Sequence, residues 1–349
     1  MHYYFKRLDG LRGLAVLMVF LSHSSYYGKT YFVNFTGWGK FGVTLFFLLS
    51  SFLLTNQIVQ AIKNGFFNKK FICIWYLKRF LRIYPLFFLY LLMSVLTTYS
   101  IYKLFNFQNM VGLPHTLKIV EALKILFLMD STGILWSVIV EFKFYILLPV
   151  IISIFYTTLK KNLIITMIVI VVLIDQLGPE YIPENNQFQL IVYMPVFLMG
   201  SICAILYQDF FLEEKIINII GKFAAILILL SIPSIRDSSG LISLHDFNKN
   251  LIFQSLIGMS IILYLIFNNN TIIHKFFENN FLRKLGNVSY GFYLYHYPVI
   301  RILSDLFNDN GLDKNIFFGL TAFIITFTMS IVSFRFFESF FLRIVKFKK

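Results

Sequence analysis

Arg12 and His23 lie at the two ends of the first apolar stretch of the sequence, eleven residues apart. In an α-helix eleven residues make about three turns, so both side chains would lie on one face, roughly 16 Å apart along the axis. Ionisable side chains are costly inside a membrane and are usually kept there for chemistry or transport. Imidazole accepts a proton readily near neutral pH, so His23 is a candidate general base. In the alternative, Arg12 only reaches toward the membrane surface and His23 only marks a helix end.

Two further arginines, Arg79 and Arg82, are three residues apart at the start of the third apolar stretch. Side chains at i and i+3 share a helix face, so the two guanidinium groups would point the same way. Such a pair suits phosphate oxygens, because each guanidinium can donate two parallel hydrogen bonds. The same pair would also serve as a positively charged end of a span at the cytoplasmic surface, and the spacing leaves both interpretations open.

A carboxyl group lies more than a turn inside another apolar stretch. Glu141 follows Trp136 and Ser137, and it is four residues from both Ser137 and Tyr145. These positions share one face of a helix. A carboxyl group in hydrocarbon must be paired or protonated, so Glu141 either bonds to another helix or takes part in chemistry.

A polar stripe carries a second histidine in an apolar stretch. Ser289, Tyr293 and His296 fall at i, i+4 and i+7, on one side of a helix. Only His23 and His296, of the six histidines, lie within predicted membrane spans. The other four fall in predicted loops or tails: His2, His115, His245 and His274. Polar stripes also hold membrane helices together, so a purely structural role for this one remains open.

The composition indicates an integral membrane protein. Hydrophobic residues make up 58% of the 349 residues and charged residues only 14%, whereas soluble domains average about 25% charged. Apolar segments of sufficient length predict an all-α fold, a polytopic transmembrane helix bundle of about ten spans in a single membrane-embedded domain covering 1–349. The predicted spans are 11–27, 41–60, 80–99, 135–156, 162–177, 189–207, 217–233, 251–268, 287–306 and 315–338.

The net charge of +14 is explained by topology. With a cytoplasmic N-terminus, eighteen Lys and Arg residues fall on the inner side of the membrane and eight on the outer side, which supports this orientation. Because the number of predicted spans is even, the C-terminus is then cytoplasmic as well. No basic soluble face is left for nucleic acid. Cys73 and Cys203 lie far apart and indicate neither a disulfide framework nor a metal site. The basic start lacks a small-residue cleavage site, so the first apolar stretch is predicted to be a retained span.

Read together, these segments resemble the acyltransferase 3 family of integral membrane acyltransferases. The matching stretches occur in the order of the family and extend over essentially the whole chain. They are LDGLRGLAVLMVFLSH, FFLLSSFLL, KRFLRIYPLF, WSVIVEFKFYILLPV and LGNVSYGFYLYH. The chain departs from the family pattern at Ser51, where glycine is usual, and at Phe142, where a second acidic residue is common.

The resemblance implies transfer of an acyl group, most often acetyl from acetyl-CoA, to a hydroxyl of a cell-envelope carbohydrate such as O-antigen, capsule or exopolysaccharide. It implies that His23, as base or transient acyl carrier, and Glu141 are catalytic. Arg12, Arg79 and Arg82 would hold the phosphates of acyl-CoA, which acts as donor substrate and not as a permanently bound cofactor. The residues expected to line the acceptor side or to orient His23 are Ser137, Trp136, Ser289, Tyr293 and His296.

The resemblance also sets expectations about partners and location. We expect a multi-pass protein of the inner (plasma) membrane that meets acyl-CoA on one side and a carbohydrate or lipid-linked glycan acceptor on the other. Many relatives carry an extracytoplasmic hydrolase-like domain after the last span. We expect this chain to be the stand-alone form without that domain, so it would complete the transfer alone or pass the acyl group to a separate partner. The alternative function is a transporter or flippase for an anionic or glycolipid substrate, which would use the same polar side chains as a pathway.

Overall fold

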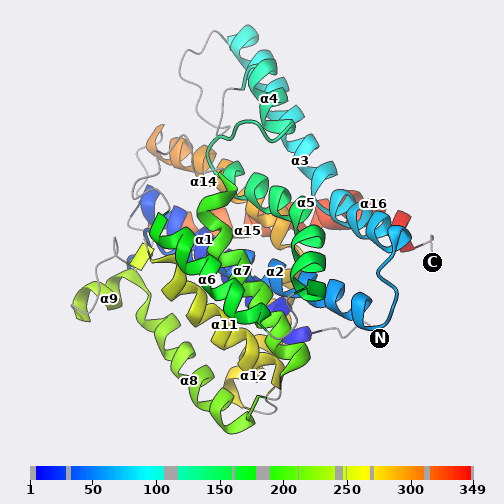
Figure 1. The fold of residues 1–349 in the computed structure, drawn as a ribbon. Helices are drawn as coiled ribbons and strands as arrows, with labels where there is room; N and C mark the ends of the chain where they lie inside the picture. Colours follow the sequence, from blue (N-terminus) through cyan, green and yellow to red (C-terminus); the bar gives the residue numbers. More distant parts are fainter. Residues whose placement is uncertain are drawn as a thin grey trace.

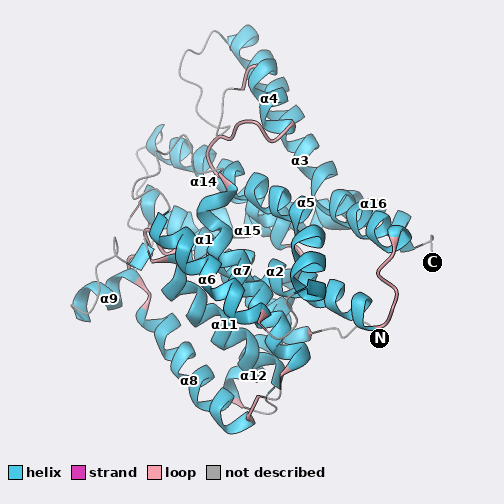
Figure 2. Cartoon of the chain, viewed as in Figure 1, coloured by secondary structure: helices cyan, strands magenta, loops and turns pink. Residues whose placement is uncertain are grey.

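The computed structural model describes residues 5–28, 33–105, 117–158, 162–177, 189–210, 212–239, 247–248, 250–267, 271–309 and 315–346. Within these residues the chain forms helices and no strand, as Figure 2 shows. The long helices are α1 (Lys6–Tyr27), α2 (Gly39–Lys63), α3 (Lys69–Phe105), α5 (Leu135–Thr158), α6 (Leu163–Leu177), α7 (Leu190–Asp209), α8 (Glu214–Leu230), α11 (Leu251–Phe267), α14 (Ser289–Asp309) and α15 (Ile316–Ser333). The shorter ones are α4 (Ile119–Leu126), α9 (Pro233–Ser239), α12 (Ile272–Glu278), α13 (Asn280–Asn287), the π-helical turn η2 (Phe334–Glu338) and α16 (Ser339–Lys346).

Each of the ten predicted apolar segments lies on one of the long helices, which confirms the all-α transmembrane fold. Five helical segments among the described residues are long and apolar enough to cross a membrane, or six if the bent pair of α11 and α12 counts as one span. The others are shorter or carry more polar residues. The number of crossings and the cytoplasmic position of both termini therefore stay predictions.

The first helix packs so closely on α12 and α13 that glycine is required at the contacts. A Cβ atom on Gly13 would lie 2.1 Å from the carbonyl oxygen of Leu282, and one on Gly286 would lie 1.9 Å from that of Asp9. Gly10 meets the carbonyl oxygen of Phe277 in the same way, at 1.9 Å. Close backbone approach between membrane helices commonly depends on such small residues. The glycines of the LDGLRG stretch thus fix the position of the helix that carries Arg12 and His23.

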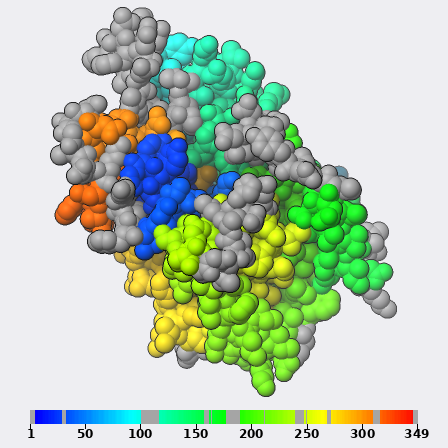
Figure 3. All heavy atoms as spheres, turned by 90° about the vertical axis from the view of Figure 1, so that its left-hand side faces the viewer, coloured from blue at the N-terminus to red at the C-terminus, as the bar shows by residue number. Residues whose placement is uncertain are grey.

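Figure 1 shows α1, α2, α14 and α15 gathered in the middle of the molecule, with α8, α11 and α12 to one side and the long α3 crossing to the other. In the space-filling view of Figure 3, the blue N-terminal residues lie between the orange residues near 300 and the yellow-green residues of the middle of the chain. Segments from both ends of the sequence therefore build the centre of the bundle.

Several helix limits differ from the predictions. α3 begins at Lys69, almost three turns before its arginine pair, because no helix breaker separates the charged residues from the apolar ones. The Asn68 side chain accepts a hydrogen bond from the backbone N–H of Phe71 at 2.9 Å. α1 begins at Lys6, five residues before the predicted span, and its first turn includes Asp9. His274, predicted in a loop, is buried in α12, where Nδ1 is 2.6 Å from Thr271 Oγ1. His2, His115 and His245 lie outside the described residues.

Ser51, which replaces a usual family glycine, has a clear place between α2 and α7. Its hydroxyl donates to the carbonyl oxygen of Phe197 at 2.5 Å and lies 2.8 Å from the hydroxyl of Ser201. A Cβ atom on Gly200 would lie 2.8 Å from the Ser51 Cβ, so α7 offers the space that the serine fills. This departure from the family pattern is a packing feature of the interface between the two helices.

Candidate active site

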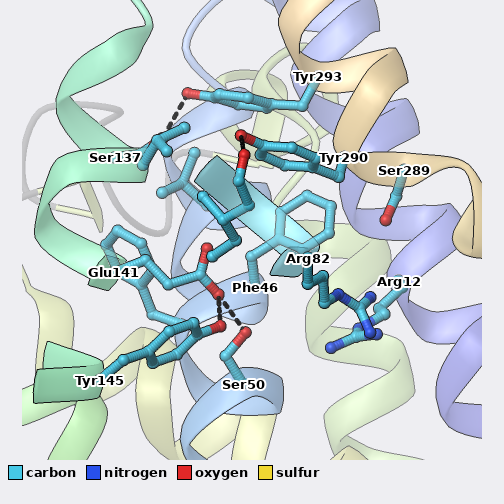
Figure 4. Close-up of a pocket in the computed structure, with 14 residues that line it drawn as sticks. Arg12, Phe46, Ser50, Arg82, Ser137, Glu141, Tyr145, Ser289, Tyr290 and Tyr293 are labelled. Carbon is cyan, nitrogen blue, oxygen red and sulfur yellow. Dashed lines mark hydrogen bonds between the residues drawn. The ribbon is translucent and has the colours of Figure 1, made fainter. Parts of the chain in front are cut away.

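A pocket lies between α1, α2, α3, α5 and α14, in the centre of the bundle. Figure 4 shows its polar side chains pointing toward one another from these helices. The polar and charged residues that line it are Arg12, Ser50, Arg82, Ser137, Glu141, Tyr145, Ser289, Tyr290 and Tyr293. Six of the ten predicted site residues therefore meet in one pocket: Arg12, Arg82, Ser137, Glu141, Ser289 and Tyr293.

The cationic end of the pocket is formed by Arg12 and Arg82, whose guanidinium groups lie near each other in Figure 4. Both also line a second pocket. Arg12 interacts electrostatically with Arg82 and with Glu141. Two guanidinium groups shared by adjoining cavities provide a site for an anion with several oxygens, because each can form bidentate hydrogen bonds. None of the ion pairs within 4 Å that the described residues form involves either arginine.

Glu141 faces the pocket from α5 and is held by two hydroxyl groups. Ser50 of α2 donates to Glu141 Oε1, and Tyr145, one turn along α5, donates to the same oxygen at 2.5 Å. The sequence predicted the shared face of Glu141 and Tyr145, and it offered no sign of Ser50. Ser50 lies on α2, and only the packing of α2 against α5 brings it to Glu141. The carboxyl group is thus fixed by hydrogen bonds from two helices.

Ser137 and Tyr293 form the opposite end of the pocket. The Ser137 hydroxyl donates to the Tyr293 hydroxyl at 2.7 Å, and Tyr293 in turn donates to the carbonyl oxygen of Ile134 at 2.8 Å. Both residues are buried. This bond joins α5 to α14 and turns the tyrosine ring toward the cavity, as Figure 4 shows.

The two intramembrane histidines are brought into direct contact beside this end of the pocket. His23 Nδ1 lies 2.9 Å from His296 Nε2. His296 is fully buried, whereas His23 is only partly buried. On its other side, His296 Nδ1 is 2.5 Å from the carbonyl oxygen of Tyr293. The pair does not line the first pocket, but it is connected to that pocket through Tyr293.

These contacts determine where the protons sit on the neutral imidazoles. A backbone carbonyl oxygen only accepts, so His296 Nδ1 carries the hydrogen and His296 Nε2 is an acceptor. His23 Nδ1 must then donate to His296, so that Nε2 of His23 carries the lone pair. His296 is therefore the group that fixes the tautomer of His23.

A cluster of tyrosines and an arginine surrounds His23 on the far side from Arg12. The Tyr297 ring packs edge-on against the imidazole at 5.4 Å, and its hydroxyl lies 3.0 Å from that of Tyr27. Arg301 donates to the Tyr27 hydroxyl at 3.0 Å. None of these three residues was predicted from the sequence as a site residue. The signal that could have indicated them is Arg301, a charged side chain one turn beyond Tyr297 in an apolar helix.

Trp136 and Arg79 lie outside the pocket. The Trp136 ring stacks on Tyr193 with centroids 4.9 Å apart, behind the wall formed by Phe47. The Arg79 guanidinium lies over the ring of Trp75, 5.9 Å from its centroid. Arg79 Nε is buried and has no hydrogen-bond partner in the described part of the chain. Since α3 continues as a helix, Arg79 and Arg82 share a face, but only Arg82 reaches the cavity.

The second pocket adjoins the first at the two arginines and is lined by residues from both ends of the chain. Besides Arg12 and Arg82, it contains Asp9, Tyr290 and Glu338. Tyr290 lines both pockets, and its hydroxyl donates to the carbonyl oxygen of Ile83 at 2.8 Å, which ties α14 to α3. Glu338 was not predicted as a site residue.

The chain matches a known protein family over most of its length. The family model described as Acyltransferase domain matches residues 5–335, and the chain therefore belongs to this acyltransferase family. The matched range includes every helix that contributes to the first pocket. The resemblance inferred from the motifs is confirmed, and the chain is a multi-pass membrane protein of an acyltransferase family. No solved structure gives a significant match.

The curated relatives are named as O-acetyltransferases. The chain is 25% identical over 377 residues to peptidoglycan O-acetyltransferase OatA of Listeria monocytogenes. This alignment covers 96% of this chain and 55% of the Listeria protein. It is 24% identical over 365 residues to O-acetyltransferase OatA of Staphylococcus aureus, with 96% and 57% coverage. The chain thus spans somewhat over half the length of the curated relatives it matches.

Proposed function

We propose that this protein is a membrane O-acyltransferase that moves an acyl group, in the first instance acetyl, from acyl-CoA to a hydroxyl of a cell-envelope carbohydrate. The observation that carries the proposal is the bond from His23 Nδ1 to His296 Nε2, which frees the other nitrogen of His23 as a base. The naming of the relatives as O-acetyltransferases, one of them of peptidoglycan, supports the reaction class and the type of acceptor.

In the proposed reaction, His23 Nε2 removes the proton from the acceptor hydroxyl as its oxygen attacks the thioester carbonyl carbon. The new C–O bond forms, the C–S bond breaks, and the departing CoA sulfur takes the proton from the imidazolium. During the charged stage, the Nδ1–H bond to His296 stabilises the imidazolium, as an orienting acceptor does in a hydrolase triad. An acyl-histidine intermediate would use the same free nitrogen.

The arginines provide the binding side of the proposal. Acyl-CoA is a polyanion, and Arg12 and Arg82 present two guanidinium groups at the junction of the two pockets. Phosphates bound there would leave the acyl-bearing arm of the donor to extend along the first pocket toward Ser137 and Tyr293. Arg79 contributes positive potential from outside the cavity wall.

Glu141 is proposed as a catalytic carboxyl group that acts on the substrate in the middle of the pocket. It lines the cavity, and Ser50 and Tyr145 both direct their hydroxyls to Oε1, so Oε2 is the oxygen left for a substrate group. We place the protein in the inner membrane, with the donor bound from the cytoplasm and the glycan acceptor, or a separate extracytoplasmic acyl-transfer partner, meeting His23.

The test is an assay of the full chain in lipid nanodiscs with radiolabelled acetyl-CoA and envelope glycan from the host strain. We expect release of CoA thiol that depends on added glycan, and an added acetyl mass on the glycan. His23→Ala should abolish both. Movement of glycan across the bilayer without thiol release would overturn the proposal in favour of a transporter.

A further inference from the structure

The second pocket holds a buried carboxyl group that no motif indicated. Glu338 is only 8% exposed, although it lies in a helical segment with strongly exposed apolar neighbours such as Phe336, at 73%, and Phe340, at 61%. It faces the pocket that Arg12 and Arg82 share with the first cavity, and it interacts electrostatically with Arg82.

The backbone is specially wound to place this side chain. Residues Phe334–Glu338 form a π-helical turn between α15 and α16. A π-turn inserts an extra residue, rotates the side chains that follow it, and occurs most often at functional sites. Here the rotated residue is a carboxyl group directed away from the apolar surface and into a cavity.

Residues of α14 and α15 contact the Glu338 carboxyl group or leave space for it. The Tyr295 hydroxyl donates to Ser333 Oγ at 2.9 Å, and Ser333 Oγ donates to Glu338 Oε1 at 3.3 Å. A Cβ atom on Gly291 would lie 3.0 Å from the same oxygen, while its other neighbours would be at ordinary distances of 3.6 Å or more. Glycine at 291 therefore leaves room specifically for Glu338.

A carboxyl group opposite two guanidinium groups has a defined effect on which anions can bind. It repels a compact anion such as pyrophosphate, because like charges placed close together cost binding energy. It also accepts a hydrogen bond from an N–H or O–H next to the anion, which a bare phosphate cannot donate. A ligand with both features is favoured over a simple anion.

We propose that Glu338 is a specificity-determining residue of the donor site, which selects an anionic donor carrying amide and hydroxyl donors beside its phosphates over bare phosphates. This inference rests on the proposed function, because acyl-CoA combines phosphates with such groups. Glu338 does not touch the reacting atoms in this proposal. It acts by weakening the binding of competing anions at Arg12 and Arg82 and by contacting the donor next to its phosphates.

The test is calorimetric binding of CoA and of inorganic pyrophosphate to the purified full chain in detergent at pH 8. Glu338→Gln keeps the size of the side chain and its ability to accept from Ser333. We expect it to tighten pyrophosphate binding about tenfold and to leave the Kd for CoA within about threefold. The preference for CoA over pyrophosphate should therefore fall.

Two further variants control for folding and for net charge. Gly291→Ala presses on Glu338 Oε1 alone and should shift the same preference in the same direction by a smaller factor. Glu214→Gln removes an exposed carboxylate at the start of α8 and should change neither Kd. If the wild-type chain binds CoA, but Glu338→Gln and Gly291→Ala both keep its preference for CoA over pyrophosphate, the proposed role of Glu338 is overturned and the proposed donor is not. A wild-type chain that does not bind CoA overturns the proposed donor together with this inference.

Discussion

The two ends of α1 carry different kinds of chemistry on one helix. At one end, Arg12 lies beside Arg82 at the junction of two cavities and is not part of any ion pair within 4 Å in the described chain. At the other, His23 is held by a hydrogen bond to the fully buried His296. The first end is open and charged, and the second is closed and neutral. The proposed reaction needs both, because it binds a polyanion and transfers a proton. A separation of about three helical turns keeps the guanidinium charge away from the imidazole, whose protonated form a nearby cation would disfavour.

The same contrast distinguishes the partner helices. α3 supplies the cationic end with Arg82, and α14 supplies the imidazole end with His296. α14 also reaches the cationic end through Tyr290, so α1 and α14 together span the site. The glycine contacts of α1 with α13 fix the position of both ends at once.

The largest expected effect is at the imidazole end. His23→Asn places an amide N–H near the position of Nδ1, so the bond to His296 can persist while the free nitrogen is lost. We expect kcat to fall by about 10²- to 10⁴-fold, the usual contribution of a general base, with little change in thermal stability. Turnover measured as thiol release and unfolding measured by fluorescence test this. Activity close to wild type would remove His23 from the mechanism.

A smaller effect is expected at the cationic end, and it should appear in KM. Arg82→Ala should raise the KM for acetyl-CoA by about 10- to 100-fold, because it removes a charged hydrogen-bonding partner of the phosphates. Arg79→Ala, one turn earlier and outside the cavity, should raise KM by less than about fivefold. Steady-state kinetics of the two variants side by side provide the comparison. Equal effects would mean that the cavity does not bind the donor.

His296 should matter through orientation. His296→Phe removes the acceptor for His23 Nδ1, so the base loses its fixed tautomer, and kcat should drop by about tenfold to a hundredfold with KM nearly unchanged. His296→Gln restores an acceptor and should recover part of the loss. Titration of kcat against pH adds a readout that a packing defect would not move. An unchanged pH profile in both variants would reduce the pair to a structural contact.

Gly13→Ala tests the common support of the two ends. Its Cβ would lie 2.1 Å from a backbone carbonyl oxygen, so α1 and α13 must separate, at a cost of about 1–3 kcal/mol. We expect a lower unfolding temperature in detergent and a loss in both kcat and donor affinity. Gly65→Ala, where nothing lies within 4 Å of the new Cβ, should affect stability only, through its φ of +70°. Unimpaired catalysis in Gly13→Ala would mean that the two ends of α1 do not depend on its contact with α13.

The smallest effect is expected at Trp136. The ring stacks on Tyr193 behind Phe47 and does not line the pocket. Trp136→Phe keeps an aromatic ring there and should change kcat/KM by less than about threefold, in contrast to changes at its neighbour Ser137. A large loss, seen in the same thiol-release assay, would place the tryptophan in contact with substrate.

The sequence predicted the fold class and much of the site for local reasons. Apolar segments of membrane length indicate helices whatever their neighbours are, and the spacing of Arg12 from His23 or of Glu141 from Tyr145 is set by helix geometry alone. Helix ends were less predictable, because the apolar stretch and the helix need not coincide. This is why α3 begins at Lys69 and why His274 lies in a helix.

The pairing of residues from distant parts of the chain was decided by packing. Nothing local to Ser50 or Glu338 marks them as site residues, since each gains its role from a helix that lies far away in the sequence. Trp136 and Arg79 belong to strong motifs and yet do not line the pocket. Periodicity assigns a side chain to a face, and only the tertiary structure decides what that face meets. The sequence by itself determined which groups could do chemistry within the membrane. The packing of α1 against α13 and α14 decided that two histidines share a hydrogen bond, and the position of α3 at the same cavity decided that Arg12 and Arg82 meet.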